Sequence, residues 1–157
     1  MKAWVSIAAT GVFALAGAAL AQSDIGPPRW MANIARHQQV MLQGVPKPYT
    51  SVRDPSPDSS AKLRQGAFLF DHNCAACHGI GGRGGGPEAF ALVPQPADLD
   101  WLAHSPADKA QPYMYWSIAE GGQAFGSEMP AYKHSLQDRD IWAIVAYIRA
   151  GYPQYPQ

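Results

Sequence analysis

The chain has 157 residues, of which 47% are hydrophobic and only 15% charged, so one folded domain with an additional segment is expected. Its 12 basic and 12 acidic residues balance, and no long basic run occurs, which excludes the charge pattern typical of nucleic-acid-binding proteins. Two cysteines are too few for a scaffold held together by several disulfides.

The first 21 residues have the features of an export signal. Lys2 supplies a positive charge, residues 5–20 are apolar and rich in alanine, and the sequence Ala-Leu-Ala at 19–21 matches a cleavage site. This pattern predicts a signal peptide over residues 1–21, removed before Gln22, and therefore a periplasmic protein. The alternative is an uncleaved membrane anchor, which the short apolar run disfavours because a span needs about 20 apolar residues.

Residues 22–60 form a proline-rich extension. Its six prolines are Pro27, Pro28, Pro46, Pro48, Pro55 and Pro57. One helix is expected after Pro28 and should end at Gly44, and residues 45–57 should be extended. This segment is expected to pack on the following domain, to contact a partner, or to serve only as a tether. The side chains suited to the first two roles are Trp30, Arg36 and Tyr49.

Residues 61–157 are predicted to be helices separated by Gly- and Pro-rich loops, without a convincing strand. A helix capped by Ser59 or Ser60 should run into the cysteine pair with Phe70 on its apolar face. A second helix is expected to begin at Pro112 and to end at Gly121.

The last helix has the clearest apolar periodicity. Its stripe consists of Ile141, Ile144, Val145 and Ile148. Ser135 and Asp138 have the spacing of a capping box at its start. Loops as long as those between these helices are unusual in a small helical domain, and a large buried cofactor would give the helices something to pack around.

Cys74-Ala75-Ala76-Cys77-His78 is a CxxCH motif. Two thiols three positions apart can each add to a vinyl group on one edge of a haem, and the adjacent imidazole then lies under the iron. The motif therefore predicts one haem c, attached through Cys74 and Cys77, with His78 as an axial iron ligand.

Three other interpretations of the cysteine pair remain open. A thioredoxin-like redox pair would need a βαβ context, and a zinc site would need further ligands, for which His104 and His134 are available. A local disulfide is the third. The predicted export signal and the adjacent histidine favour haem attachment over all three.

Met129 is the favoured second axial ligand. It lies in a predicted loop directly before Pro130, which restricts the approach of the chain, so its thioether can reach over a haem face. Met41 and Met114 fall on predicted helices and are assigned to packing. His134 and His104 are the reserve candidates.

Several weaker signals are interpreted as structural. The pattern GxGxxG at 79–84 follows no strand, so dinucleotide binding is not expected. Trp101 and Trp116 have two possible roles, a hydrogen bond to a haem propionate or core packing. Arg83 is assigned to a solvated loop.

Together these motifs resemble class I cytochrome c, over residues 61–157 but not over the extension. In that resemblance Cys74 and Cys77 match the thioether cysteines, His78 the proximal ligand, and Met129 with Pro130 the distal-ligand motif. It implies an all-α cytochrome c fold, with three to four helices and Gly/Pro-rich loops around one covalent haem.

The resemblance also covers contacts away from the iron. The segment 140–149 looks like the family's C-terminal helix, and Gly66 and Phe70 look like the N-terminal helix contact that lets Tyr147 approach. Pro87 looks like the loop proline whose carbonyl accepts a hydrogen bond from the proximal histidine, which would orient the ring.

The function expected from these residues is one-electron transport in the periplasm, with iron held by His78 and Met129. With both axial positions filled no substrate binds iron, so an enzyme is not expected, and the partners are a donor and an acceptor redox protein that dock weakly. One alternative is a haem subunit of a larger dehydrogenase or respiratory complex, including a membrane complex, docked through residues 22–60. Another is a gas-binding or catalytic haem protein with a labile sixth ligand.

Overall fold

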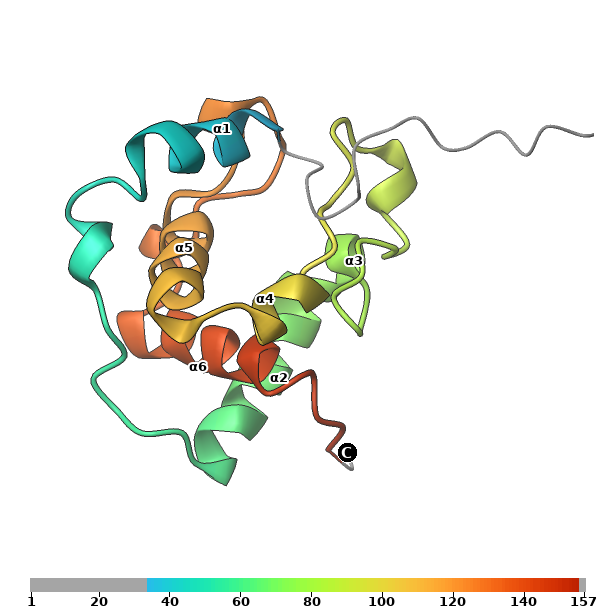
Figure 1. The fold of residues 1–157 in the computed structure, drawn as a ribbon. Helices are drawn as coiled ribbons and strands as arrows, with labels where there is room; N and C mark the ends of the chain where they lie inside the picture. Colours follow the sequence, from blue (N-terminus) through green and yellow to red (C-terminus); the bar gives the residue numbers. More distant parts are fainter. Residues whose placement is uncertain (1–33, 156–157) are drawn as a thin grey trace, which may run out of the picture.

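The computed structural model describes residues 34–155, so the predicted signal peptide and Trp30 lie outside the described part. Within it the chain is entirely helical, with no strand, which confirms the predicted all-α class (Figure 1). The α-helices are α1 (Ile34–Gln43), α2 (Ser60–Asn73), α3 (Ala75–His78), α4 (Asp100–His104), α5 (Ala107–Glu120) and α6 (Asp138–Arg149). Four short 3₁₀ turns are η2 (Tyr49–Ser51), η3 (Ala89–Ala91), η4 (Gln123–Phe125) and η5 (Tyr132–His134).

Helix α2 begins where its sequence predicts. The Ser59 hydroxyl accepts a hydrogen bond from the backbone N–H of Lys62 at 3.2 Å, which satisfies one of the free donors in the first turn. The helix then leads through Phe70 into the cysteine segment, where the Cys74 N–H donates to the Phe70 carbonyl at 2.8 Å.

Helices α2 and α6 cross in close contact at Gly66. A Cβ atom at Gly66 would overlap the Ala143 carbonyl oxygen and lie 2.8 Å from the Tyr147 Cβ. The Phe70 ring, one turn further along, packs on the Tyr147 ring with a centroid distance of 5.6 Å. The contact predicted among Gly66, Phe70 and Tyr147 is thus present, and it fixes how α2 and the attachment segment sit against the rest of the domain.

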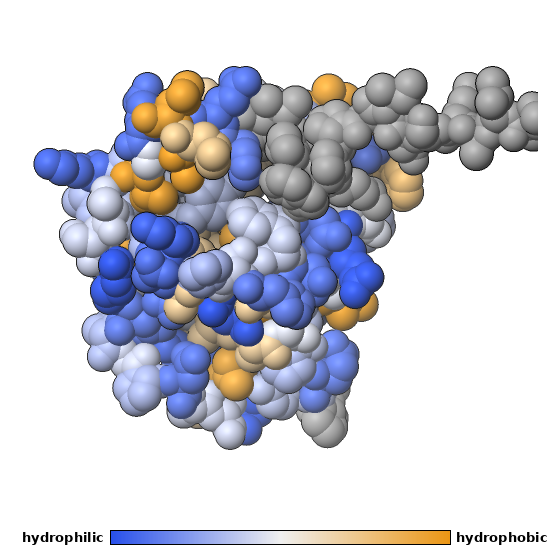
Figure 2. Space-filling view, viewed as in Figure 1, coloured by the Kyte–Doolittle hydropathy of each residue, from blue (hydrophilic) through white to orange (hydrophobic). Residues whose placement is uncertain are grey.

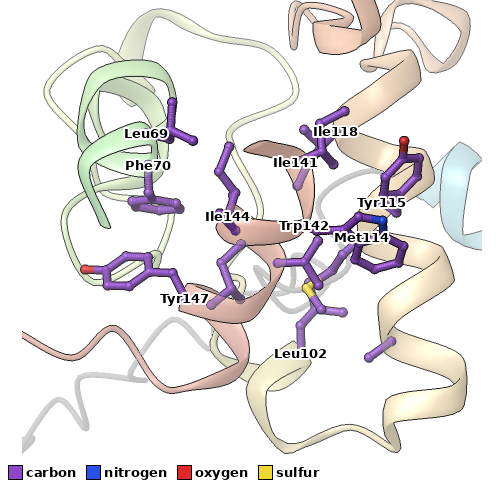
Figure 3. Packing of buried hydrophobic residues seen from close by; sticks show 14 of the residues in the cluster. Leu69, Phe70, Leu102, Met114, Tyr115, Ile118, Ile141, Trp142, Ile144 and Tyr147 are labelled. Atoms are coloured by element: carbon purple, nitrogen blue, oxygen red, sulfur yellow. The ribbon is translucent and has the colours of Figure 1, made fainter. Parts of the chain in front are cut away.

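The hydrophobic core lies between α2, α5 and α6 (Figure 3). Helix α6 supplies a continuous buried run from Ile141 to Ile148, wider than the predicted stripe because α2, α4 and α5 all pack against it. The ring of Trp142 packs on that of Tyr115 from α5 with a centroid distance of 4.6 Å. This packing makes α5 and α6 one scaffold for the loops that follow them.

The predicted start of α5 was wrong, because the helix begins at Ala107 and Pro112 lies inside it. Pro112 cannot donate to the carbonyl of Asp108, four residues earlier, but Asp108 is exposed, so water can satisfy that carbonyl. Pro112 itself is buried. The predicted end was correct, since Gly121 stops the helix with a φ of 67°.

The predicted capping box of α6 is displaced by two residues. The cap is Gln137, whose backbone N–H donates to the Asp140 carboxylate at 3.2 Å, rather than Ser135 with Asp138. The turn η5 ends at His134 and Ser135 still follows its geometry, so the helix cannot start there.

The extension runs along the outside of the helical domain, and α1 lies beside the segment that joins α5 to α6 (Figure 1). Helix α1 ends at Gly44, as predicted, and the interval 45–57 is interrupted by η2 rather than extended throughout. Met41 is 75% exposed, so its predicted packing role was wrong. With Leu42 it contributes to the apolar surface over α1 seen in Figure 2. In the described part of the chain, no helix is long and apolar enough to cross a membrane.

Candidate functional site

The CxxCH motif forms a single tight turn, helix α3, directly after α2. The N–H of His78 donates to the Cys74 carbonyl at 2.8 Å, which closes this turn. Both cysteines are free thiols. Burial, followed by the neighbouring Cys77 thiol, raises the pKa of Cys74 to about 12, so this thiol is protonated at neutral pH.

His78 is held by a backbone carbonyl. Its Nδ1 lies 3.0 Å from the carbonyl oxygen of Ala97, and because a carbonyl can only accept, Nδ1 is the donor. Burial lowers the pKa of His78, while the hydrogen bond to Ala97 opposes this effect. The neutral ring with Nδ1 protonated leaves the Nε2 lone pair available, which is the form that binds a metal.

The acceptor for His78 is Ala97 and not Pro87, so that prediction is corrected. Pro87 is exposed, and the loop around it runs back along α3, where the Glu88 N–H donates to the Ala76 carbonyl at 2.9 Å. The segment that reaches the His78 imidazole is the later one at 96–98, which lies beside the first loop through a 2.7 Å bond from the Leu99 N–H to the Gly82 carbonyl.

The loop that carries Met129, residues 121–134, is anchored at the end of α5 and is called the Met129 loop below. The Gly122 N–H donates to the Met129 carbonyl at 2.8 Å. A Cβ at Gly121 would lie 2.6 Å from that same carbonyl oxygen. Two consecutive glycines therefore let the returning loop pack directly on the helix end. The partly buried Met129 side chain packs against the core cluster.

The same loop also reaches the attachment segment. The Tyr132 hydroxyl donates to the carbonyl of Asn73, the residue before Cys74, at 2.6 Å. Burial, with a further contribution from the Cys74 and Cys77 thiols, raises the pKa of Tyr132 to about 12. The structure thus brings the Met129 loop and the CxxCH turn together, although 51 positions (129 − 78) separate Met129 from His78 in sequence.

The reserve ligands have other surroundings. His104 is exposed, and its Nδ1 lies 3.1 Å from the Asp100 carbonyl in its own helix. His134 is exposed at the end of η5. Arg83 is exposed, as predicted. Trp116 is buried beneath the Arg36 guanidinium of α1. Packing of Arg36 on the domain was one of the options expected for it, but its partner Trp116 was not predicted.

The donor set of this site fits haem c and does not fit the other interpretations. Across residues 34–155 there is no strand for a thioredoxin-like fold and no group of three or more His, Cys, Asp or Glu side chains that could hold a metal ion. The two cysteines are not joined to each other. Two free thiols and an adjacent oriented neutral imidazole are the groups that would attach and ligate haem c, and the thioether of the nearby Met129 loop is a candidate second ligand.

A carboxylate links the extension to this loop. Glu120, the last residue of α5, accepts hydrogen bonds from Lys133 Nζ at 2.6 Å and from the Tyr49 hydroxyl, and these bonds lower its pKa. Because the folded pKa is below the ordinary value, the contribution to stability is present above about pH 4.3 and is lost as pH falls through the folded pKa.

We therefore expect Glu120→Gln to flatten the loss of stability in acid. Urea unfolding from pH 7 to pH 3 measures this directly: the free energy of unfolding of the wild type should fall more steeply below about pH 4.3 than that of the variant. If the free energies of unfolding of wild type and variant fall in parallel with pH, Glu120 does not contribute to the loss of stability in acid. Glu128→Gln is the control, because Glu128 is exposed and lies in the same region.

Comparison with known proteins identifies the family. The family model described as "Cytochrome C oxidase, cbb3-type, subunit III" matches residues 61–148, more than half of the chain. The chain belongs to this cytochrome c domain family. The match begins where the extension ends and includes the CxxCH motif and the Met129 loop, so the predicted resemblance to a c-type cytochrome is confirmed. Membership supports a haem c electron-transfer role.

Two similar proteins provide further context. The chain is 35% identical over 89 residues to the cbb3-type cytochrome c oxidase subunit FixP of Sinorhizobium medicae (strain WSM419), covering 53% of this chain and 28% of that protein. The fold is similar to a chain of the Kuenenia stuttgartiensis reducing HAO-like protein complex Kustc0457/Kustc0458, with a TM-score of 0.53 and 22% identity over 71% of this chain and 53% of that one. The chain thus spans roughly a quarter of the first relative's length and half of the second's.

Proposed function

We propose that this protein is an exported one-electron carrier with a single covalent haem c, held by His78 and Met129. The observation that carries the proposal is the tie between the Met129 loop and the attachment turn, made by the 2.6 Å hydrogen bond from Tyr132 to Asn73. Bound haem would supply an iron that accepts one electron and passes it on.

The roles of the residues follow from their surroundings. Cys74 and Cys77 would hold the group through thioether bonds, and His78, oriented by Ala97, would offer its Nε2 lone pair to the iron. Met129 would offer its thioether from the opposite loop, and this ligand raises the reduction potential. With two protein ligands in place, no site on the iron is left for a substrate.

Covalent attachment is tested by removing both thiols. The protein is produced with a c-type haem maturation system, and the Cys74→Ala, Cys77→Ala double variant is compared with wild type. We expect haem staining on a denaturing gel for the wild type and none for the double variant, because non-covalent haem is lost on unfolding. Replacing His72, which is exposed and lies two residues before Cys74, by alanine is the control and should leave the staining unchanged.

Equal staining of the double variant and wild type would refute attachment through these residues. Absence of haem in the wild type would refute the proposed function altogether. The predicted signal peptide is tested in the same preparation by mass spectrometry, which should find an N-terminus at Gln22 in periplasmic material. An N-terminus at Met1 would instead support the membrane anchor.

A second candidate is a haem subunit of a larger redox complex, because the family and the relative FixP are both named as oxidase subunits. In that case the extension 22–60 would be the docking element. Purification from native periplasm and membranes separates the two: a monodisperse monomer supports the free carrier, and a stable assembly with other redox proteins supports the subunit.

A further inference from the structure

One of the extension residues that contact the domain is a buried arginine. Arg36 of α1 is only 4% exposed, although charged side chains are rarely buried without partners. Its guanidinium carbon lies 5.0 Å from the ring centroid of Trp116 and 4.9 Å from that of Phe125, and Nη2 donates to the carbonyl of Gly121. A cation packed against two aromatic rings, away from water, is held more strongly than one at the surface.

These contacts of Arg36 are made with residues in, or shortly before, the loop that carries Met129. Gly121 is the point where the loop leaves α5, Phe125 lies in η4 within the loop, and Trp116 lies on α5 one turn before its end. Gly122, next to the Arg36 acceptor, donates to the Met129 carbonyl at 2.8 Å. Arg36 therefore connects Gly121, at the start of the loop, to Phe125 within it.

A second contact from the extension is made with Glu120, the last residue of α5 directly before the same loop. The Tyr49 hydroxyl donates to Glu120, whose other oxygen accepts from Lys133 Nζ at 2.6 Å. The Tyr49 ring also packs on the Tyr115 ring at a centroid distance of 6.0 Å. The extension thus contacts the start of the segment 121–134 directly, through Arg36 and Tyr49, and Glu120 connects the Tyr49 contact to Lys133 at the other end of that segment.

We propose that Arg36 is a positioning residue for the Met129 loop, with Tyr49 in a supporting role, so that the extension sets how firmly the sixth ligand is held. The inference rests on the proposed ligation of iron by Met129. Without the guanidinium, the loop loses a charged hydrogen bond and contacts to two rings, and the population of open conformations rises. A ligand that competes with Met129 then binds more tightly, because it binds only the open form.

The test uses the full haem-loaded protein and its Arg36→Ala, Arg36→Lys and Arg53→Ala variants. Arg53 is the matched control: it is an exposed extension arginine that donates only to the nearby carbonyls of Thr50 and Val52. Two quantities are measured, the affinity of the ferric protein for imidazole and the hydrogen-exchange rate of the Gly122 amide.

For Arg36→Ala we expect roughly tenfold or greater increases in both imidazole affinity and Gly122 exchange, within the usual range of coupling between two sites. Arg36→Lys should be intermediate, because lysine keeps the charge but lacks the planar fork that stacks on rings and reaches the carbonyl. Arg53→Ala should match wild type in both.

Wild-type imidazole affinity and Gly122 exchange in Arg36→Ala would overturn the proposal. A lower unfolding midpoint with unchanged imidazole affinity would also overturn it, because that result indicates a merely structural role. If Arg36→Ala fails to fold, imidazole affinity and Gly122 exchange are measured on Arg36→Lys and Tyr49→Phe instead. Wild-type values of both quantities in both variants refute the proposal. Failure of the Met129 assignment is recognised separately, by a Met129→Ala spectrum that equals wild type.

Discussion

Replacing Met129 by alanine is expected to change the iron from low-spin to high-spin and to open it to carbon monoxide. If Met129 occupies the sixth position about 99% of the time, it lowers the apparent affinity for carbon monoxide about a hundredfold, and the variant removes that competition. The weak far-red ferric band of methionine ligation should disappear. The reduction potential should fall, because a thioether ligand favours the reduced state. Absorption spectra of the ferric and ferrous protein, a redox titration and carbon monoxide titration of the ferrous protein measure these changes.

Met41→Ala is the matched control for this experiment, since Met41 is 75% exposed on α1 and should leave the spectrum unchanged. His134→Ala and His104→Ala test the reserve ligands in the same way. A Met129→Ala protein with the wild-type spectrum would contradict the assignment, and the histidine variant that then loses the low-spin bands would identify the ligand. A high-spin wild type would instead favour the gas-binding or catalytic alternative.

The substitution Gly66→Ala is expected to destabilise the domain by about 3 kcal/mol or more. Helix propensity alone predicts the opposite sign, a gain of about 1 kcal/mol, because alanine is the better helix former. Packing decides, since the added Cβ would overlap the Ala143 carbonyl oxygen and lie 2.8 Å from the Tyr147 Cβ, and backbone cannot move aside as a flexible side chain can. Chemical unfolding of the haem-loaded protein measures the difference.

Gly85→Ala is the control, because a Cβ there meets nothing within 4 Å and its φ is not positive. Its effect should stay within about 0.5 kcal/mol of zero. A Gly66→Ala variant as stable as Gly85→Ala would mean that α2 and α6 cross less closely than described. In that case the crossing of α2 and α6 would not explain how the attachment segment is placed on the core.

Local patterns in the sequence were sufficient for the attachment motif and for several helix ends. The cap at Ser59, the stop at Gly121 and the end of α1 at Gly44 were predicted correctly, because each depends on a few neighbouring residues. The start of α5 was not, because a proline is tolerated inside a helix when the carbonyl that it leaves unpaired is exposed.

The partners across long sequence separations were decided by the tertiary structure. His78 has a backbone acceptor as predicted, but spacing does not reveal which carbonyl reaches it, and the fold brings Ala97 there in place of Pro87. The two aromatic neighbours of Arg36 lie 80 and 89 positions away (116 − 36 and 125 − 36), so no local pattern could indicate their contact.

By itself, then, the sequence determined which chemistry is available, since CxxCH and a methionine before proline are local arrangements of reactive atoms. It also determined the all-α class, through the period of the apolar residues. The tertiary structure alone decided which distant residues contact the attachment segment and the Met129 loop. Burial of Arg36, the bond from Tyr132 to Asn73 and the crossing at Gly66 arise only when distant segments exclude water together.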